Sequence, residues 1–226
     1  MSDREPSEPE PAPGAIPGAI PGAVIEAVPE AVIDNRVFVL VLQHPQERRE
    51  ALATAAVTVA ALRRARLVAG LSWPNLSRVL GRRADPKRWG VLYLGSARPA
   101  ALGQGRETAG REIILMGRDG KALADPDAIL RGLEGIVLID GSWKEAKTLW
   151  WRNPWLLKLH RLVVNPPRPA RLGRLRREPR PEALSTLEAA ALVLRQLEAG
   201  PAAADTLLAV LDRLMKAARP PAGVAV

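Results

Sequence analysis

The sequence predicts an α/β fold, in which a mostly parallel sheet is covered by helices on both faces. The predicted strands are short runs of consecutive apolar residues, and helical patterns separate each run from the next. Strands of that composition bury both faces, as they do in a parallel sheet between two helical layers. The length of 226 residues suits one such domain with a dispensable extension. We therefore expect a disordered Pro/Ala/Gly-rich tail at 1–34 and a folded domain at 35–219.

The first half of the chain supplies the tail, two strands and a long helix. A Glu/Pro-rich start leads into the repeat PGAI, PGAI, PGAV, whose prolines interrupt both helices and sheets. A buried strand is expected at 37–45, and apolar residues at helical spacing predict a helix over 46–66. Residues 67–90 are expected to be irregular, because Pro74, Gly81 and Pro86 interrupt them. VLYLG at 91–95 predicts the second strand.

The second half continues the alternation. A third strand is expected at 112–117, closed by a turn at Asp119-Gly120. A helix at 126–133 then leads to a strand at 136–139. The next helix, 143–152, is expected to stop before Asn153-Pro154, and HRLVVNPP at 160–167 predicts another strand. An Arg/Pro-rich loop follows to residue 181, and the last two helices are expected at 185–198 and 202–218.

Charge and composition indicate the partner and exclude several kinds of site. The formal net charge is +9, most of the cations are arginines, and these favour a polyanionic partner such as RNA. The absence of cysteine excludes disulfides, and two histidines make a protein-only zinc site unexpected, so we predict no metal. Three prolines break the apolar stretch 15–33, and no secretory signal is visible. We therefore expect a cytoplasmic protein with no membrane partner. The oligomeric state is left open.

The segment LIDGSWKEAKTLWW at 138–151 holds the strongest candidate site. Asp140 ends an apolar strand, Gly141 follows it, and a helix begins at once. Open α/β sheets place ligands at the carboxyl ends of their strands, next to helix N-termini. Capping does not explain Asp140, since it lies just outside the strand and before a glycine that lets another backbone approach closely. Asp140 is therefore a candidate functional residue.

Two helices share a capping-box pattern. Ser142 with Glu145, and Ser185 with Glu188, both have the spacing in which a serine caps a helix and a glutamate bonds back to it. Capping alone would explain these four residues. The alternative is that the two positive N-termini converge on one carboxylate-bearing ligand. His44 presents a similar choice, and a hydrogen-bonded structural histidine is favoured over a chemical role.

Tryptophans and arginines suggest an RNA-facing surface. Trp150 is expected to pack in the core, whereas Trp151 shares a side with Lys144 and Lys147, which suits base stacking. Seven arginines fall between 161 and 180, in a Pro-rich loop with no helix to solubilise. A second cluster at 78–88 is expected to extend the same groove. The candidate RNA-binding residues are Arg49, Lys144, Lys147, Trp151, Arg174, Arg176 and Arg177.

Four segments in this order resemble the DTW-domain proteins: 42–49 (LQHPQERR), 91–95, 138–156 and 184–194 (LSTLEAAALVL). That family is named for the motif Asp-x-Thr-Trp, and this chain carries Asp140, Gly141, Ser142 and Trp143. Serine keeps the hydroxyl of threonine and lacks its methyl group. The resemblance covers roughly residues 36–200. Family members often carry a Cys-rich segment before the His-Pro block, and here the Pro-rich tail stands in its place.

The resemblance implies an activity and a cosubstrate. DTW-domain proteins are tRNA-uridine aminocarboxypropyltransferases related to the SPOUT class of S-adenosylmethionine (AdoMet)-binding folds, which often thread a loop into a knot. The implied reaction transfers the 3-amino-3-carboxypropyl group of AdoMet to N3 of a uridine in tRNA and releases methylthioadenosine. Asp140 is then the candidate base, or the group that positions the edge of the uracil. The residues implied to bind AdoMet are Leu94, Gly95, Ser96, Asp140, Gly141, Ser142, Trp143, Leu184, Ser185, Thr186 and Glu188.

Two other functions remain open from the sequence. One is a SPOUT-like RNA methyltransferase, which would leave adenosylhomocysteine as its product. The other is a non-catalytic RNA-binding module, which AdoMet binding would distinguish from both enzymes. The modified uridine, and the choice between tRNA and rRNA, are not determined.

Overall fold

One six-stranded sheet organises the fold. The computed structural model describes residues 31–49, 53–93, 111–165 and 184–217. In chain order the strands are β1 (Phe38–Gln43), β2 (Ala65–Ala69), β3 (Trp89–Leu92), β4 (Ile113–Met116), β5 (Gly135–Asp140) and β6 (His160–Val164). They lie in the order β2-β1-β5-β3-β6-β4. All neighbouring strands pair in parallel except β4, which is antiparallel to β6 at the edge. The prediction of a mostly parallel sheet is confirmed.

Both faces of the sheet are buried, as the continuous apolar runs predict. In β1, Val39 and Val41 join one hydrophobic cluster, whereas Leu40 and Leu42 join another. Successive side chains of a strand point to opposite faces, so an uninterrupted apolar strand supplies two cores at once.

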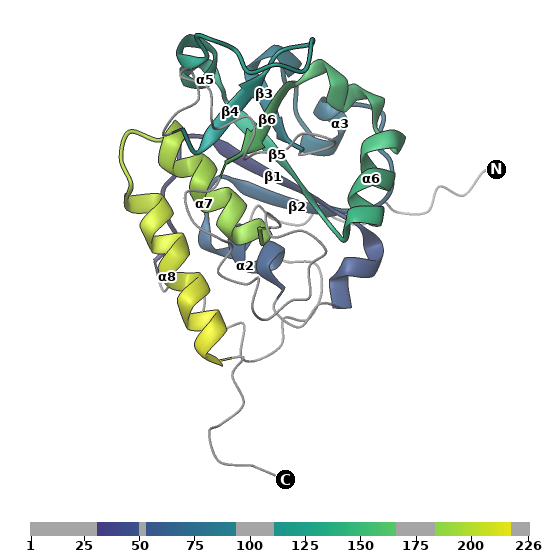
Figure 1. Cartoon of the computed structure of the whole chain (residues 1–226). Helices are drawn as coiled ribbons and strands as arrows, with labels where there is room; N and C mark the ends of the chain where they lie inside the picture. Colours follow the sequence, from purple (N-terminus) through teal and green to yellow (C-terminus); the bar gives the residue numbers. More distant parts are fainter. Residues whose placement is uncertain (1–30, 50–52, 94–110, 166–183, 218–226) are drawn as a thin grey trace, which may run out of the picture.

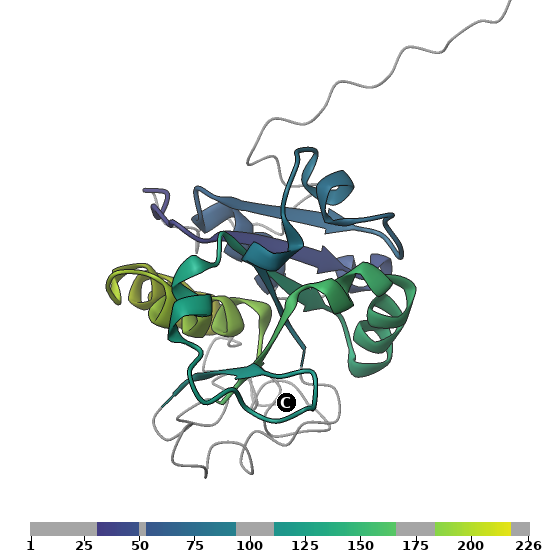
Figure 2. The same ribbon diagram turned by 90° about the horizontal axis from the view of Figure 1, so that it is seen from above.

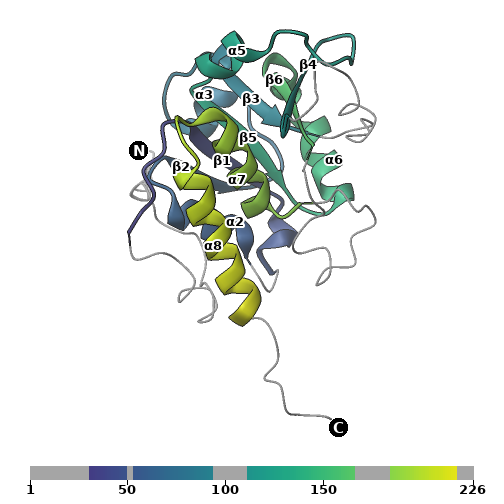
Figure 3. The ribbon, with the colours of Figure 1, turned by 60° about the vertical axis from the view of Figure 1, so that its left-hand side comes forward.

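Helices cover both faces. The first cluster takes its helical residues from α2 (Thr54–Ala61), α5 (Asp127–Gly132), α7 (Thr186–Leu197) and α8 (Ala202–Ala217). The second takes them from α3 (Leu76–Leu80), α6 (Trp143–Arg152) and the 3-10 turn η3 (Pro154–Lys158). Figure 1 shows α7 and α8 on one side of the sheet and α3 and α6 on the other, and Figure 2 shows the same layers from above. α8 lies along α7 (Figure 3), which explains why nearly every residue of α7 is buried.

The predicted helix 46–66 is wrong at both ends. A 3-10 turn, η1 (Pro45–Arg49), opens the segment, and the α-helix extends only from Thr54 to Ala61. Ala65–Ala69 instead form β2, which pairs with β1 along its whole length. The α-helix ends at Ala61, and Leu62 already has an extended backbone. Beyond it, pairing with a neighbouring strand decides the conformation, and only the tertiary structure supplies that neighbour.

The prediction that 67–90 is irregular is also wrong in part. Besides the end of β2, this stretch contains α3, the 3-10 turn η2 (Pro86–Arg88) and the start of β3. Asn75 caps α3 by accepting a hydrogen bond from the Arg78 N–H (3.0 Å), and Gly81, at φ 68°, ends it. Pro74, Gly81 and Pro86 therefore do interrupt the chain, but the segments between them form short helices and turns. The remaining predicted helices lie within one residue of where they are expected, and α6 has both of the ends predicted for it. The predicted strands 91–95 and 160–167 correspond to β3 and β6, and their last residues, 94–95 and 166–167, lie outside the described residues.

Ile33 lies within the segment 1–34 assigned to the tail, and it contacts the folded domain. Ile33 forms a parallel bridge with Leu62, in which Ile33 N donates to Ala61 O (2.8 Å) and Arg63 N donates to Ile33 O (2.9 Å). The Ile33 side chain packs against the core. Residues 31–34, which the sequence places in the predicted tail, therefore include a docked position. Among the helices of the described segments, none is long and apolar enough to cross a membrane.

Candidate functional site

The carboxyl ends of β1 and β5 form the candidate site. Gln43, the last residue of β1, pairs in register with Asp140, the last residue of β5. From β1 the chain moves outward to β2, and it then returns to the other side of β1 for β3. This reversal is a topological switch point, beyond which open α/β sheets bind their ligands. β5 fills the switch point, so its terminal Asp140 lies where a ligand is expected.

Asp140 joins three elements. Its carboxylate accepts a hydrogen bond at Oδ2 from Gln43 Nε2 (2.9 Å) and another at Oδ1 from the Thr186 hydroxyl, at the first turn of α7. Only 8% of Asp140 is exposed. A carboxylate that accepts from two buried donors fixes the relative positions of β1, β5 and α7.

Gly141 allows α6 to begin directly after β5. Its φ is 155°, a conformation that residues with a side chain rarely adopt. A Cβ atom here would lie 2.9 Å from Cβ of Glu145 and 3.4 Å from Cβ of His44. The close approach expected of this glycine is therefore to the chain's own His44 and Glu145.

Glu145 links the start of α6 to His44. It forms a capping box with Ser142, whose N–H donates to Glu145 Oε2 (2.7 Å), and its Oε1 lies 3.3 Å from His44 Nδ1. Burial raises the pKa of Glu145, but the hydrogen bonds from Ser142 and the charge of His44 outweigh burial and hold that pKa below its usual value. At neutral pH Glu145 is therefore an anion beside the imidazole.

The second capping box brings α7 to the same place. Ser185 Oγ accepts from the Glu188 N–H (3.2 Å), and Ser185 N donates back to Glu188 Oε2 (3.3 Å). Ser185, Thr186 and Glu188 are all buried. Since Thr186 bonds to Asp140 and α6 starts three residues after Asp140, both helix N-termini meet here. Each N-terminus already has a carboxylate of its own, supplied by Glu145 or Glu188.

An aromatic pair lies beside this edge of the sheet. Tyr93, immediately after β3, stacks on Trp150 of α6 with ring centroids 4.0 Å apart and an interplanar angle of 8°. Burial raises the pKa of the Tyr93 hydroxyl, and the positive charge of Arg161 opposes the shift. Trp150 is half-buried against the second core, as predicted. Sequence reasoning missed Tyr93, because it lies within an apolar run that packing alone explains.

The outer face of α6 carries the predicted RNA-facing side chains. Lys144, Lys147 and Trp151 are all exposed, and Trp151 is 72% exposed. Spacings of three and four residues place them along one side of the helix. Lys144, the first of these residues, follows Asp140 by four positions.

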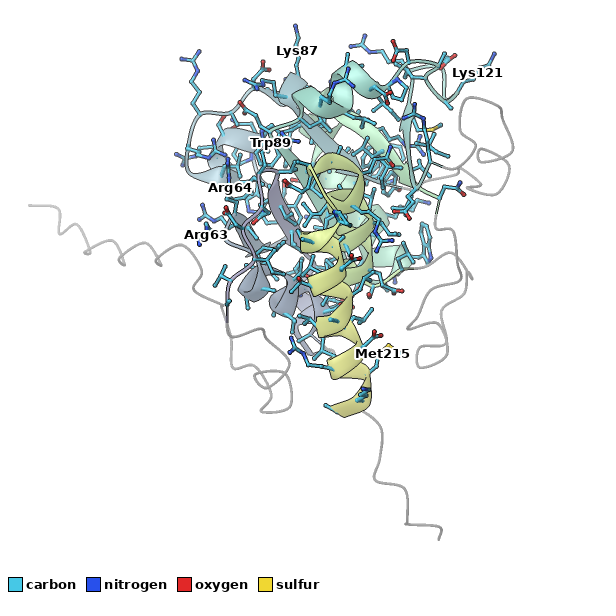
Figure 4. All side chains as sticks on the ribbon, turned by 90° about the vertical axis from the view of Figure 1, so that its left-hand side faces the viewer. Arg63, Arg64, Lys87, Trp89, Lys121 and Met215 are labelled. Atoms are coloured by element: carbon cyan, nitrogen blue, oxygen red, sulfur yellow. The ribbon has the colours of Figure 1, made fainter. Side chains whose placement is uncertain are left out.

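The cluster expected to extend that groove lies elsewhere. Arg82 lies over the ring of Phe38, the first residue of β1, and Lys87 and Arg88 immediately precede β3. These cations are therefore at the amino ends of the strands, opposite Asp140. Figure 4 views this side, with Lys87 at the top and Arg63 and Arg64 at the left. The expectation of one continuous basic groove is therefore wrong for this cluster. After β2 the chain returns through α3 to the amino ends of the strands, whereas Asp140 lies at the carboxyl ends.

Several predicted site residues lie outside the described residues: Leu94, Gly95, Ser96, Arg174, Arg176 and Arg177, and the side chain of Arg49. Leu184 is described and half-buried, and it precedes the Ser185 cap. Within the described segments, no group of three or more His, Asp or Glu side chains is arranged to hold a metal ion. Gln43 was missed, although a polar residue at the end of an apolar strand is a recognisable signal.

Comparison with known proteins identifies the family. The sequence profile of the DTW domain matches residues 21–219. The chain is 31% identical over 184 residues to the Drosophila melanogaster protein "tRNA-uridine aminocarboxypropyltransferase 2", and the match covers 79% of this chain and 63% of that relative. No solved structure matches the chain. Since the profile spans most of the chain and contains the Asp140–Trp143 loop, the chain belongs to the DTW-domain family.

Proposed function

We propose that this protein transfers the 3-amino-3-carboxypropyl group of AdoMet to N3 of a uridine in tRNA and releases methylthioadenosine. The observation that carries the proposal is the family's motif loop, anchored through Asp140 at the switch point of the sheet. The name of the Drosophila relative supports the same reaction and tRNA as the substrate. We propose further that the fold is SPOUT-like, with the knotted loop that such folds often contain.

The charges at the site suit AdoMet. Its sulfonium and ammonium groups are cations, and Asp140, Glu145 and Glu188 place carboxylates at this edge of the sheet. The side chains of 185–188 are buried, and those of Ser185, Thr186 and Glu188 are hydrogen-bonded within the protein. We propose that these side chains hold the turn 185–188 in shape. The backbone of this turn is proposed to contact the cosubstrate together with residues 94–96 and 140–143. The N-termini of α6 and α7 already hold glutamates, so the cosubstrate carboxylate is expected elsewhere.

The reaction sets three requirements. The γ-carbon of the methionine part of AdoMet, and not its methyl carbon, must face the nucleophile. The uridine must leave its stack, because N3 lies on the pairing edge of the base. The N3 proton must go to a base. Asp140 accepts two internal hydrogen bonds and is buried, so we assign it the task of positioning the motif loop.

The outer face of α6 is the proposed contact with tRNA. Lys144 and Lys147 can pair with phosphates, and the exposed ring of Trp151 can stack on a base. The arginines at 174, 176 and 177 are proposed to continue this contact from the loop that precedes α7.

The test is product analysis. Protein, tRNA and AdoMet labelled in its carboxypropyl carbons are incubated, and nucleosides and small molecules are analysed by mass spectrometry. Labelled aminocarboxypropyluridine with an equal amount of methylthioadenosine is the expected result. A methylated nucleoside with adenosylhomocysteine would establish the methyltransferase alternative instead. AdoMet binding without a product from any RNA, or no binding at all, would overturn the proposed transfer.

A further inference from the structure

We propose that His44 is the base that takes the N3 proton of the uridine, and that Glu145 positions its imidazole for this task. The inference rests on the proposed function and adds to it a catalytic residue outside the motif loop. It also reverses our expectation that His44 is only structural.

His44 lies at the same carboxyl ends of the strands as Asp140. It follows the last residue of β1, and its backbone N–H donates to the backbone oxygen of Asp140 (3.0 Å). Its side chain is 12% exposed. The imidazole is therefore held at the strand ends, next to the loop that the family's motif defines.

The contacts of Nδ1 select the tautomer. Nδ1 lies 3.3 Å from Glu145 Oε1, which can only accept, and 3.4 Å from the backbone N–H of Gln46, which can only donate. One tautomer cannot satisfy both. The anionic carboxylate makes the stronger bond, so the proton resides on Nδ1 and the lone pair is on Nε2. A neutral imidazole in that tautomer is a base at Nε2.

Other groups around the imidazole are consistent with this role. The second oxygen of Glu145 is held by the Ser142 N–H (2.7 Å), so the carboxylate cannot rotate freely. Glu47 of η1 is a further ionisable group next to Glu145. Asp140 is a poorer candidate for the base, because Gln43 and Thr186 bond to both of its oxygens.

The proposed step balances in atoms and charge. Nε2 of His44 takes the N3 proton, and the N3 electron pair forms a bond to the γ-carbon of AdoMet. The bond from that carbon to sulfur breaks, and its electron pair stays on sulfur, which leaves as the neutral thioether of methylthioadenosine. One positive charge moves from sulfur to the imidazole, where the Glu145 carboxylate stabilises it.

Two substitutions separate the base from the fold. His44→Asn retains an N–H that can reach Glu145 but has no base, and kcat is expected to fall ~10²-fold or more. Glu145→Gln retains the capping box, since glutamine serves at that position, but removes the charge and presents an N–H to Nδ1. That interaction favours the other tautomer, so kcat should fall at least ~10-fold with little change in melting temperature. The control is Glu198→Gln, since Glu198 accepts from the Val37 N–H (2.8 Å) just before the start of β1.

The readout is kcat against pH, with AdoMet affinity and melting temperature measured in parallel. A general base in its neutral form makes the rate rise with pH; this rise is expected in the wild-type protein and should be absent in His44→Asn. Imidazole added to His44→Ala should restore part of the rate. A wild-type pH profile in His44→Asn, or a folded His44→Ala that imidazole does not rescue, overturns the role of His44. Lack of aminocarboxypropyluridine from the wild-type protein instead overturns the proposed function.

Discussion

Thr186, the first residue of α7, donates its hydroxyl hydrogen bond to Asp140, the last residue of β5 and 46 positions earlier in the chain. This bond is the direct link between the second capped helix and the family's motif loop. It explains why two segments that are distant in sequence belong to one site.

The link predicts a cost for removing the hydroxyl. Thr186→Val preserves the shape of the side chain and leaves Oδ1 of buried Asp140 without this donor, so the free energy of unfolding should fall by about 1–3 kcal/mol. Denaturant unfolding measures the change. Thr186→Ser retains the hydroxyl and should lose much less. Equal stability of the valine and wild-type proteins would show that this bond does not anchor α7.

Asn153 predicts a larger effect. This fully buried amide donates to the backbone oxygens of Leu71 (3.0 Å) and Leu149 (2.8 Å), and it accepts from the Trp73 N–H (2.9 Å) and from Trp155 Nε1 (3.2 Å). Asn153→Asp replaces both donors by a charged acceptor and should cost about 3 kcal/mol or more.

The matched control for Asn153 is Asn75→Asp. Asn75 is exposed and caps α3 only by accepting a bond, which aspartate does equally well. Thermal melting of both variants should show a large loss for position 153 and almost none for position 75. Similar losses at both positions would contradict the importance of the buried amide.

Any side chain at Gly135 is expected to lower the stability of the fold, because Trp89 packs directly against this glycine. An added Cβ atom would lie 2.5 Å from the ring of Trp89, which is fully buried. Gly135→Ala should therefore destabilise the fold by about 1–3 kcal/mol through overpacking. Gly132→Ala, where a Cβ atom would meet nothing within 4 Å, is the control in the same urea series. A neutral Gly135→Ala would mean that Trp89 can move aside.

Two truncations test where the domain begins. Removing residues 1–30 should leave the melting temperature unchanged, since a Pro-interrupted repeat has little to bury. Removing residues 1–34 also deletes Ile33, with its two backbone bonds to the segment 61–63 and its packing on the core. That second truncation should cost about 1–3 kcal/mol. Calorimetry on both proteins distinguishes this from our expectation, based on sequence, that 1–34 is dispensable.

The two basic surfaces predict different effects on tRNA. Replacing Lys144 and Lys147 by glutamine should weaken tRNA binding and reduce the logarithmic salt slope by up to ~2 units, about one for each phosphate that a lysine no longer neutralises. Replacing Arg83 and Lys87 of the cluster 78–88 by glutamine removes the same charge. It should weaken tRNA binding less, because this cluster lies near the amino ends of the strands and Asp140 lies at the carboxyl ends. Filter binding over a salt series measures both. Equal losses of affinity would mean that tRNA binds the opposite side as strongly.

The sequence by itself determined the layers of the fold and the position of the motif. Uninterrupted apolar runs required a sheet buried on both faces, and the serine and glutamate spacings fixed where α6 and α7 begin. These are local signals, set by residues within a few positions of one another. The place of Asp140 at a strand end also follows from such a signal.

Only the tertiary structure decided which residues meet. Ala65–Ala69 became a strand because β1 lay beside them, and the cluster at 78–88 reached the opposite edge because the chain crosses the sheet through α3. The bonds of Asp140 with Gln43 and Thr186, and of His44 with Glu145, join residues that are distant in the sequence. No local pattern specifies such pairs, because they arise from strand order and register, which depend on how the whole chain packs.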